Sequence, residues 1–105
     1  MHLHCLRLAA FVTVLAFPTM AIEAAEPAPP AQLAEACSSC HGIDGRSTGA
    51  IPPLAGQDRD TLIAKLTDFR DTENGQTIMT RLARGYSDAE IAALADYFSS
   101  LEATP

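Results

Sequence analysis

The sequence predicts a small all-α protein of about three helices joined by long loops. Two segments, residues 58–71 and 87–101, repeat apolar side chains at the three- and four-residue spacing of one helix face. No segment alternates apolar and polar residues as a half-buried strand does. With 105 residues and no internal repeat, the chain is long enough for one domain and too short for two.

The charge balance is acidic, with 13 Asp and Glu residues against 7 Lys and Arg and a formal net charge of −6. Non-specific binding of nucleic acid depends on Lys and Arg neutralising phosphates, so the composition argues against a nucleic-acid partner. The apolar fraction of 48% argues against disorder throughout the chain.

Residues 1–24 are predicted to be a signal peptide, cleaved near Ala21 to Ala25. The first seven residues carry no acid, an apolar run follows at 8–17, and small residues precede the cut, which is the pattern of a secretory signal. A membrane anchor is the rival interpretation. As a helix, residues 8–22 reach only roughly 22 Å, whereas the hydrocarbon core is ~30 Å thick.

Removal of this segment predicts an exported, periplasmic protein whose mature chain has no membrane span. Roughly 80 residues remain, and a chain of that size buries a thin core unless a cofactor, metal or partner adds to it. The mature chain keeps four residues that bear on such a cofactor, and no other Cys, His or Met: Cys37, Cys40, His41 and Met79.

The helical domain is predicted to span residues 32–105, after a flexible Pro-rich segment at 25–31. Residues 31–36 are expected to form a short helix that runs into Cys37. Residues 42–57 are rich in Gly, Pro and Ser and are predicted to be loop.

The two longer helices carry clearer signals. In residues 58–71 the stripe comprises Leu62, Ile63, Leu66 and Phe69, and either Asp58 or Asp60 is expected to cap its start. A turn is predicted at 73–77, with Met79 in the turn region downstream of this helix. Ser87 and Glu90 then form an S-x-x-E capping box for the last helix.

Residues 37–41, CSSCH, form the C-x-x-C-H signature of c-type haem attachment. Two thiols three residues apart on a helical turn reach the two vinyl groups on one edge of a porphyrin. The next residue, His41, then projects beneath the ring and ligates the iron.

Three other interpretations of the motif are weaker. A structural zinc site needs four ligands, and only three sulfur or nitrogen candidates lie here. A thioredoxin-like redox pair needs a βαβ context that the pattern lacks. A Cys37–Cys40 disulfide suits an exported protein and would make the chain a haem-free, disulfide-stapled binding module, but it closes a very small loop.

Met79 is the candidate for the second axial ligand, because the mature chain offers no other Met and no second His. A methionine is more often a core gap-filler than a ligand. A His/Met pair raises the reduction potential relative to two histidines and closes the iron to small molecules.

Around a bound haem, seven apolar residues are expected to pack: Leu54, Leu62, Leu66, Ile78, Leu82, Leu94 and Phe98.

Two prolines, Pro52 and Pro53, precede Leu54 in a rigid stretch of the loop. Either can present a carbonyl to Nδ1 of His41, since a ligating histidine usually donates its other N–H to a fixed acceptor. Alternatively the two prolines only stiffen the loop.

Arg81 and Arg84 either line a docking face at the haem edge or are solvated at a helix end.

Three stretches together resemble a class I c-type cytochrome: CSSCHGIDG at 37–45, IPPLAGQ at 51–57 and IMTRLARGYSDAEIAALADYF at 78–98. They are most similar to the monohaem cytochrome subunit of flavocytochrome c sulfide dehydrogenases. The resemblance implies a small class I cytochrome c fold wrapped around one covalently bound haem. It implies that Cys37 and Cys40 attach the haem and that His41 and Met79 are axial. It also aligns Pro52 with the residue whose carbonyl holds the histidine, and Leu54 with a haem-packing leucine.

The resemblance further implies electron transfer rather than catalysis by this chain alone. Its expected partners are an FAD-containing flavoprotein subunit that oxidises sulfide and a downstream electron acceptor such as another cytochrome. The alternative is a free-standing soluble periplasmic cytochrome c that shuttles electrons. Pro53 departs from the family pattern, where a small or basic residue is common, and is expected to stiffen the loop.

Overall fold

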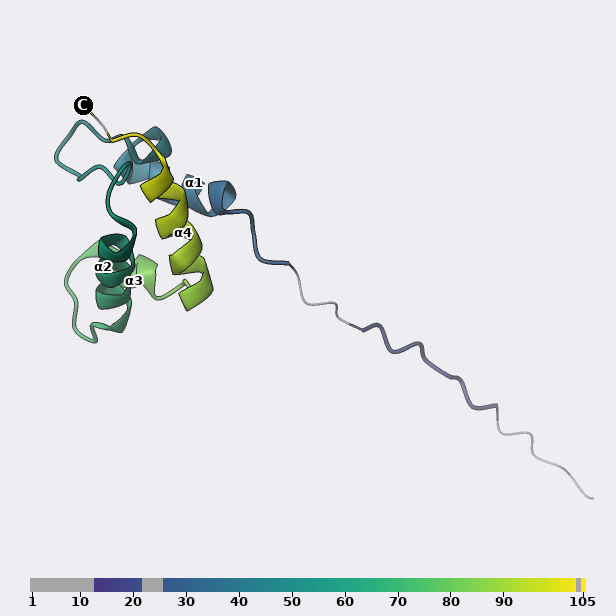
Figure 1. Cartoon of the computed structure of the whole chain (residues 1–105). Helices are drawn as coiled ribbons and strands as arrows, with labels where there is room; N and C mark the ends of the chain where they lie inside the picture. The colour runs from purple at the N-terminus through teal and green to yellow at the C-terminus, as the bar shows by residue number, and fades with distance from the viewer. Residues whose placement is uncertain (1–12, 22–25, 104) are drawn as a thin grey trace, which may run out of the picture.

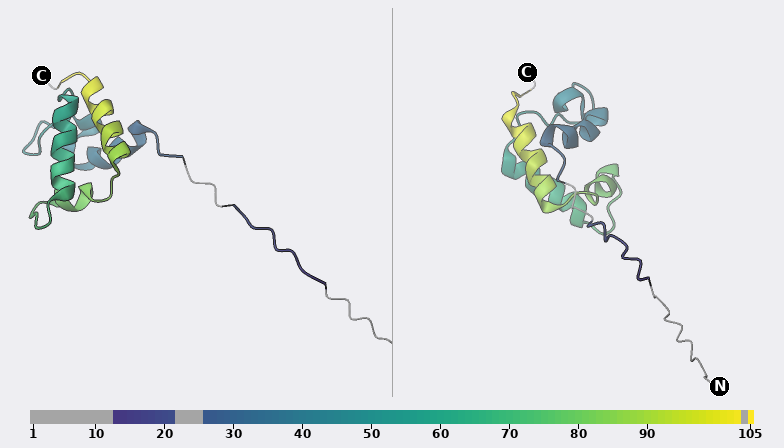
Figure 2. Two further views of the ribbon diagram at one scale, coloured as in Figure 1. Left: turned by 60° about the horizontal axis from the view of Figure 1, so that its bottom comes forward. Right: turned by 90° about the vertical axis from the view of Figure 1, so that its right-hand side faces the viewer.

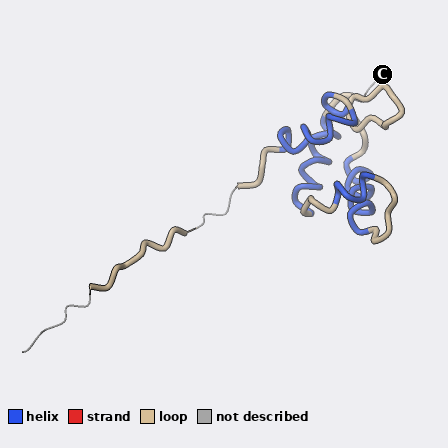
Figure 3. Tube along the Cα trace, turned by 180° about the vertical axis from the view of Figure 1, so that it is seen from behind, coloured by secondary structure: helices blue, strands red, loops and turns tan. Residues whose placement is uncertain are grey.

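A computed structural model of the chain describes residues 13–21, 26–103 and 105, and all regular secondary structure within them is helical (Figures 1 and 3). The elements are α1 (Pro30–His41), a 3₁₀ turn η1 (Ile43–Gly45), α2 (Arg59–Asp71), α3 (Ile78–Ala83) and α4 (Asp88–Ser100). The predicted all-α fold class is confirmed.

Helix α4 is the centre of the domain and packs against both α1 and α2. Figure 2 shows α2 and α4 side by side, and the ion pairs Arg59–Asp96 and Arg70–Asp88 link their exposed faces. The apolar stripe of α4 points inward because its residues recur at helical spacing. The buried core cluster comprises Ala34 from α1, Leu62 from α2, and Leu94, Ala95 and Phe98 from α4.

The predicted start signals of both long helices are present in the structure. Asp58 caps α2 through a hydrogen bond of 2.9 Å from the Thr61 amide, and this bond lowers the pKa of the Asp58 carboxyl. At α4 the Glu90 amide donates to the Ser87 hydroxyl at 3.2 Å, and the Ser87 amide donates to the Glu90 carboxylate at 2.8 Å. Both caps are local in sequence, so they act before any tertiary contact forms.

Loss of the capping box should weaken α4 measurably. The variant Ser87→Ala is expected to lower the free energy of unfolding of the holoprotein by about 1 kcal/mol, because it removes the acceptor for the Glu90 amide. Chemical denaturation followed by circular dichroism measures this. Ser87→Asp keeps an acceptor and should restore most of the loss, whereas equal destabilisation by both variants would contradict the capping role.

Helix α1 begins earlier and ends later than predicted. It starts at Pro30, two residues before the predicted domain boundary, because a proline at the first helical position needs no N–H partner and has a helical φ already. It continues through the whole C-x-x-C-H motif and ends at His41. Gly42, with φ 82°, then turns the chain away from the helix axis.

The described residues form four α-helices where the sequence predicts about three, and Met79 lies in a helix rather than a turn. The unexpected element is α3, which is only six residues long. So short a segment shows too little periodicity to indicate a helix, and its N-cap residue, Thr77, forms no side-chain cap.

Tertiary contacts secure α3 instead. The Thr80 hydroxyl donates to the carbonyl of Gly75 at 3.1 Å, and the Arg84 guanidinium donates to the carbonyls of Thr72 and Glu73 at 2.9 Å. Arg84 therefore closes the loop between α2 and α3.

The long loop after α1 is folded back onto α4 at Gly45. The Gly45 carbonyl accepts hydrogen bonds from the amides of Leu54 and Ala55 at 2.8 and 3.1 Å. The φ of Gly45 is +69°, and a Cβ atom on this residue would lie 2.8 Å from the Phe98 ring and 2.9 Å from Leu54. Only glycine fits this close approach, which fixes where the Pro52–Leu54 stretch lies.

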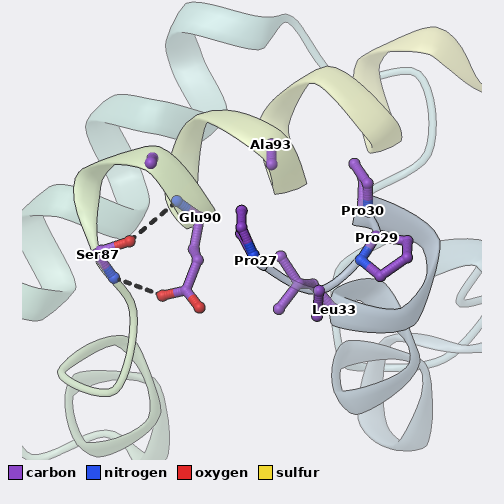
Figure 4. Close-up of a pocket in the computed structure, with 9 residues that line it drawn as sticks. Pro27, Pro29, Pro30, Leu33, Ser87, Glu90 and Ala93 are labelled. Carbon is purple, nitrogen blue, oxygen red and sulfur yellow. Dashed lines mark hydrogen bonds between the residues drawn. The ribbon is translucent and has the colours of Figure 1, made fainter. Parts of the chain in front are cut away.

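The Pro-rich segment before α1 runs beside the start of α4 rather than free of the domain (Figure 4). Pro27 and Pro29 border a surface cavity of about 560 Å³ together with Leu33, Glu90 and Ala93.

Of the predicted signal peptide, residues 13–21 are exposed and non-helical and lie away from the helical domain in Figure 1. The rest of residues 1–24 falls outside the described residues. Within the described part of the chain, no helix is both long and apolar enough to span a membrane.

Candidate functional site

One cavity of about 730 Å³ opens among α1, the following loop, α2, α3 and α4. Its lining includes all six residues that the sequence singled out: Cys37, Cys40, His41, Pro52, Leu54 and Met79. The seven apolar residues expected to surround a haem line it as well. Segments far apart in sequence therefore meet at one apolar chamber.

The C-x-x-C-H motif occupies the last turn of α1. Cys37 is half-buried and Cys40 exposed, and both are free thiols. Because a helix turns once in about 3.6 residues, Cys37, Cys40 and His41 share one face, the face toward the cavity. Burial raises the pKa of the Cys37 thiol, which keeps this side chain neutral near pH 7.

The imidazole of His41 is buried and held in one orientation. Its Nδ1 lies 2.6 Å from the carbonyl oxygen of Pro52. A carbonyl oxygen only accepts, so Nδ1 carries a hydrogen, and Nε2 is the ring nitrogen left for a ligand. Pro52 rather than Pro53 faces His41, because the Pro53 carbonyl accepts a hydrogen bond from the Gln57 side chain instead.

Met79 lies in the first turn of α3, half-buried, on the same cavity as His41. Ile78 and Leu82 flank it in the lining. The thioether is a soft, polarisable group with no hydrogen to lose, and here it shares the chamber with the imidazole of His41.

Outside the C-x-x-C-H motif, sequence reasoning missed four polar residues of the lining: Gln57, Lys65, Thr77 and Tyr86. Lys65 follows Leu62 by three residues and precedes Phe69 by four, so its place on the inner face of α2 was readable from the spacing. Gln57 and Tyr86 gave no such signal, because both lie in irregular segments. Burial raises the pKa of the Tyr86 hydroxyl.

The candidate ligand side chains and the apolar lining of the cavity fit one kind of cofactor. Two thiols on one helical turn, an imidazole beside them and an apolar chamber suit a large, flat, apolar macrocycle with a metal at its centre. These features, in a small all-helical chain, define a class of protein: those that carry a covalently bound c-type haem.

Comparison with known proteins gives the family. Residues 29–102 match the family model for Cytochrome c, so the chain belongs to the cytochrome c family. The predicted resemblance to class I c-type cytochromes and the predicted all-α cytochrome c fold are thereby confirmed. Proteins of this family transfer electrons on a covalently bound c-type haem, so this chain is a haem-binding electron-transfer protein.

Relatives of this chain have names that describe different roles in electron transfer. The chain is 38% identical over 69 residues to the cytochrome subunit of sulfide dehydrogenase from Chlorobaculum tepidum, covering 66% of this chain and 63% of that protein. It is 35% identical over 100 residues to cytochrome c-553 from Nitratidesulfovibrio vulgaris, covering 90% and 98%. It is 39% identical over 69 residues to a thiosulfate dehydrogenase electron acceptor from Stutzerimonas stutzeri, covering 62% and 32%.

Proposed function

We propose that this chain is an exported monohaem cytochrome in which Cys37 and Cys40 attach the haem and His41 and Met79 are its axial ligands. The bound haem supplies reversible one-electron oxidation and reduction of its iron. The observation that carries the proposal is the His41–Pro52 contact of 2.6 Å, which frees Nε2 in a cavity lined by both thiols and by Met79.

Each residue has a distinct part in this proposal. The thiols, on adjacent positions of the α1 inner face, bind the macrocycle on one edge and fix its orientation. The Pro52 carbonyl orients His41 and increases the basicity of Nε2 by accepting the Nδ1 hydrogen. Leu54, next to this contact in the lining, packs against the macrocycle and excludes water.

The proposed electron donor is an FAD-containing flavoprotein subunit that oxidises sulfide. It is supported by the likeness to the cytochrome subunit of sulfide dehydrogenase. The cavity is bordered by exposed apolar side chains, Ile51 at 42%, Ile78 at 62% and Leu82 at 49% exposure. Among the described lining residues there is no Asp or Glu, although the chain carries a net charge of −6. Such a surface suits a partner that docks by apolar contact. Electrons would leave to a downstream acceptor such as another cytochrome.

The second candidate function is a free-standing periplasmic shuttle. It is favoured by the likeness to cytochrome c-553, which covers 90% of this chain and 98% of the relative. Both candidates share the same haem site and differ only in whether a flavoprotein stays bound.

Purification of the tagged full chain from its native host tests these proposals. We expect a secreted haem protein whose N-terminus lies between residues 22 and 26, accompanied by a flavin-containing chain in equal amounts. The visible spectrum reports the haem, and fluorescence after denaturation reports released FAD. A haem protein that elutes alone at low salt would favour the shuttle, and a secreted polypeptide without haem would contradict both.

A further inference from the structure

Resting on the proposed function, we propose that Lys65 and Gln57 form the binding site for the carboxylates of the haem. A c-type haem carries two propionate groups on the edge opposite the vinyl positions. A carboxylate beside an apolar wall needs a cation or several hydrogen-bond donors, because its desolvation is otherwise costly.

Lys65 is the one Lys or Arg among the described residues that line the cavity. It lies on α2 between Leu62 and Phe69, which form the apolar wall of the same chamber. Besides the motif residues Cys37, Cys40 and His41, the titratable side chains of the lining are Lys65 and Tyr86. The lining therefore presents one fixed positive charge and, among its described residues, no carboxylate.

Four of the five other cations of the domain are engaged elsewhere, and the fifth, Arg81, lies outside the described lining. Arg59 and Arg70 pair with aspartates on the outer face. Arg46 donates to the Glu102 carbonyl at 2.8 Å, and Arg84 to the loop before α3. Lys65 instead donates to a neutral group, the Gln57 side-chain oxygen at 3.2 Å. An ammonium has three N–H donors, so this contact leaves two for an anion.

Gln57 holds the ammonium in place. Its amide nitrogen donates to the carbonyl of Pro53, which turns its oxygen toward Lys65. Pro53 in turn adjoins Pro52, whose carbonyl orients His41. The chain Pro53–Gln57–Lys65 thus ties the proposed carboxylate anchor to the same rigid loop that positions the axial histidine.

The anchor and the attachment residues lie on different walls of the cavity. The cysteines are on α1 and Lys65 is on α2, and these helices both pack on α4. A macrocycle attached at Cys37 and Cys40 would have to reach across the cavity for its carboxylates to meet Lys65. This direction matches the porphyrin itself, in which vinyl and propionate groups occupy opposite edges.

The test is the pH dependence of the haem midpoint potential in the holoprotein. A carboxylate near the iron makes the potential fall with pH as it ionises, and an ammonium beside it lowers its pKa. In Lys65→Gln, the pH range over which the potential falls is expected to lie about one pH unit higher than in the wild type. At pH values above that range, the midpoint potential of the variant is expected to be lower than that of the wild type. Lys65→Arg should keep the wild-type profile. Arg81→Gln, which removes an exposed cation outside the described lining, should leave the profile unmoved.

Two results would overturn the inference. One is a Lys65→Gln profile that shifts no more than that of Arg81→Gln. The other comes from a crystal structure of the wild-type holoprotein, if the Lys65 ammonium lies beyond about 3.5 Å from both haem carboxylates. A purified chain without haem would instead contradict the proposed function, so the two failures are distinguishable.

Discussion

The double variant Cys37→Ser with Cys40→Ser is expected to lose covalent haem and, with it, the stable folded domain. The core cluster is small, with five buried residues from three helices, and much of the remaining apolar surface faces the cavity of about 730 Å³. Burying apolar surface contributes about 25 cal/mol per Å². A large macrocycle that fills this chamber therefore contributes an amount comparable to the ~5–15 kcal/mol that stabilises a whole domain.

Far-UV circular dichroism and limited proteolysis of the exported double variant measure the outcome. We expect strongly reduced helicity and rapid digestion. The control is Ser38→Ala with Ser39→Ala, which alters the two residues between the cysteines, whose hydroxyls donate only to neighbouring backbone carbonyls or to Cys40. That control should retain haem and fold. Wild-type helicity and cooperative unfolding of the cysteine variant without haem would contradict a cofactor-organised core.

The parts of the fold that the sequence predicts well are those with local causes. The stripe of α4 follows directly from residues at helical spacing, and its start from the Ser87–Glu90 pair three residues apart. The start of α2 likewise depends on Asp58 and the Thr61 amide. These interactions lie within one helical turn, so they can be inferred without knowing any tertiary contact.

The parts that sequence reasoning missed have non-local causes. Helix α3 is held by Arg84, whose guanidinium donates to a loop 11 and 12 residues earlier. The two prolines alone leave open which of them faces His41, and only the family resemblance selects Pro52, because the choice depends on how Gly45 folds the loop back. The spacing on α2 indicates the position of Lys65, but its hydrogen bond to Gln57 joins two segments and has no local signal. Residue types and spacing indicate the cofactor, whereas the shape of the chamber depends on such contacts.

Met79→Leu is expected to keep the fold and haem attachment but to lower the midpoint potential. Leucine conserves the volume of the side chain and removes its sulfur, so any change reports ligation rather than packing. Axial ligands set haem potentials over a range of about 0.8 V, and loss of a thioether should lower this one by on the order of 0.1 to 0.2 V. Redox titration measures the fall, and loss of the sulfur-to-iron absorption band accompanies it.

Carbon monoxide provides the decisive second measurement for Met79. With the sixth position open, reduced Met79→Leu should bind carbon monoxide readily, whereas the wild-type protein should resist it. The matched control is Leu82→Ala, one helical turn further along α3, which also alters the cavity lining but leaves the sulfur in place. Beyond the proposed signal peptide the sequence has no other Met and no second His, so no comparable ligand is available there to replace Met79. An unchanged spectrum and continued exclusion of carbon monoxide in Met79→Leu would remove Met79 from the iron.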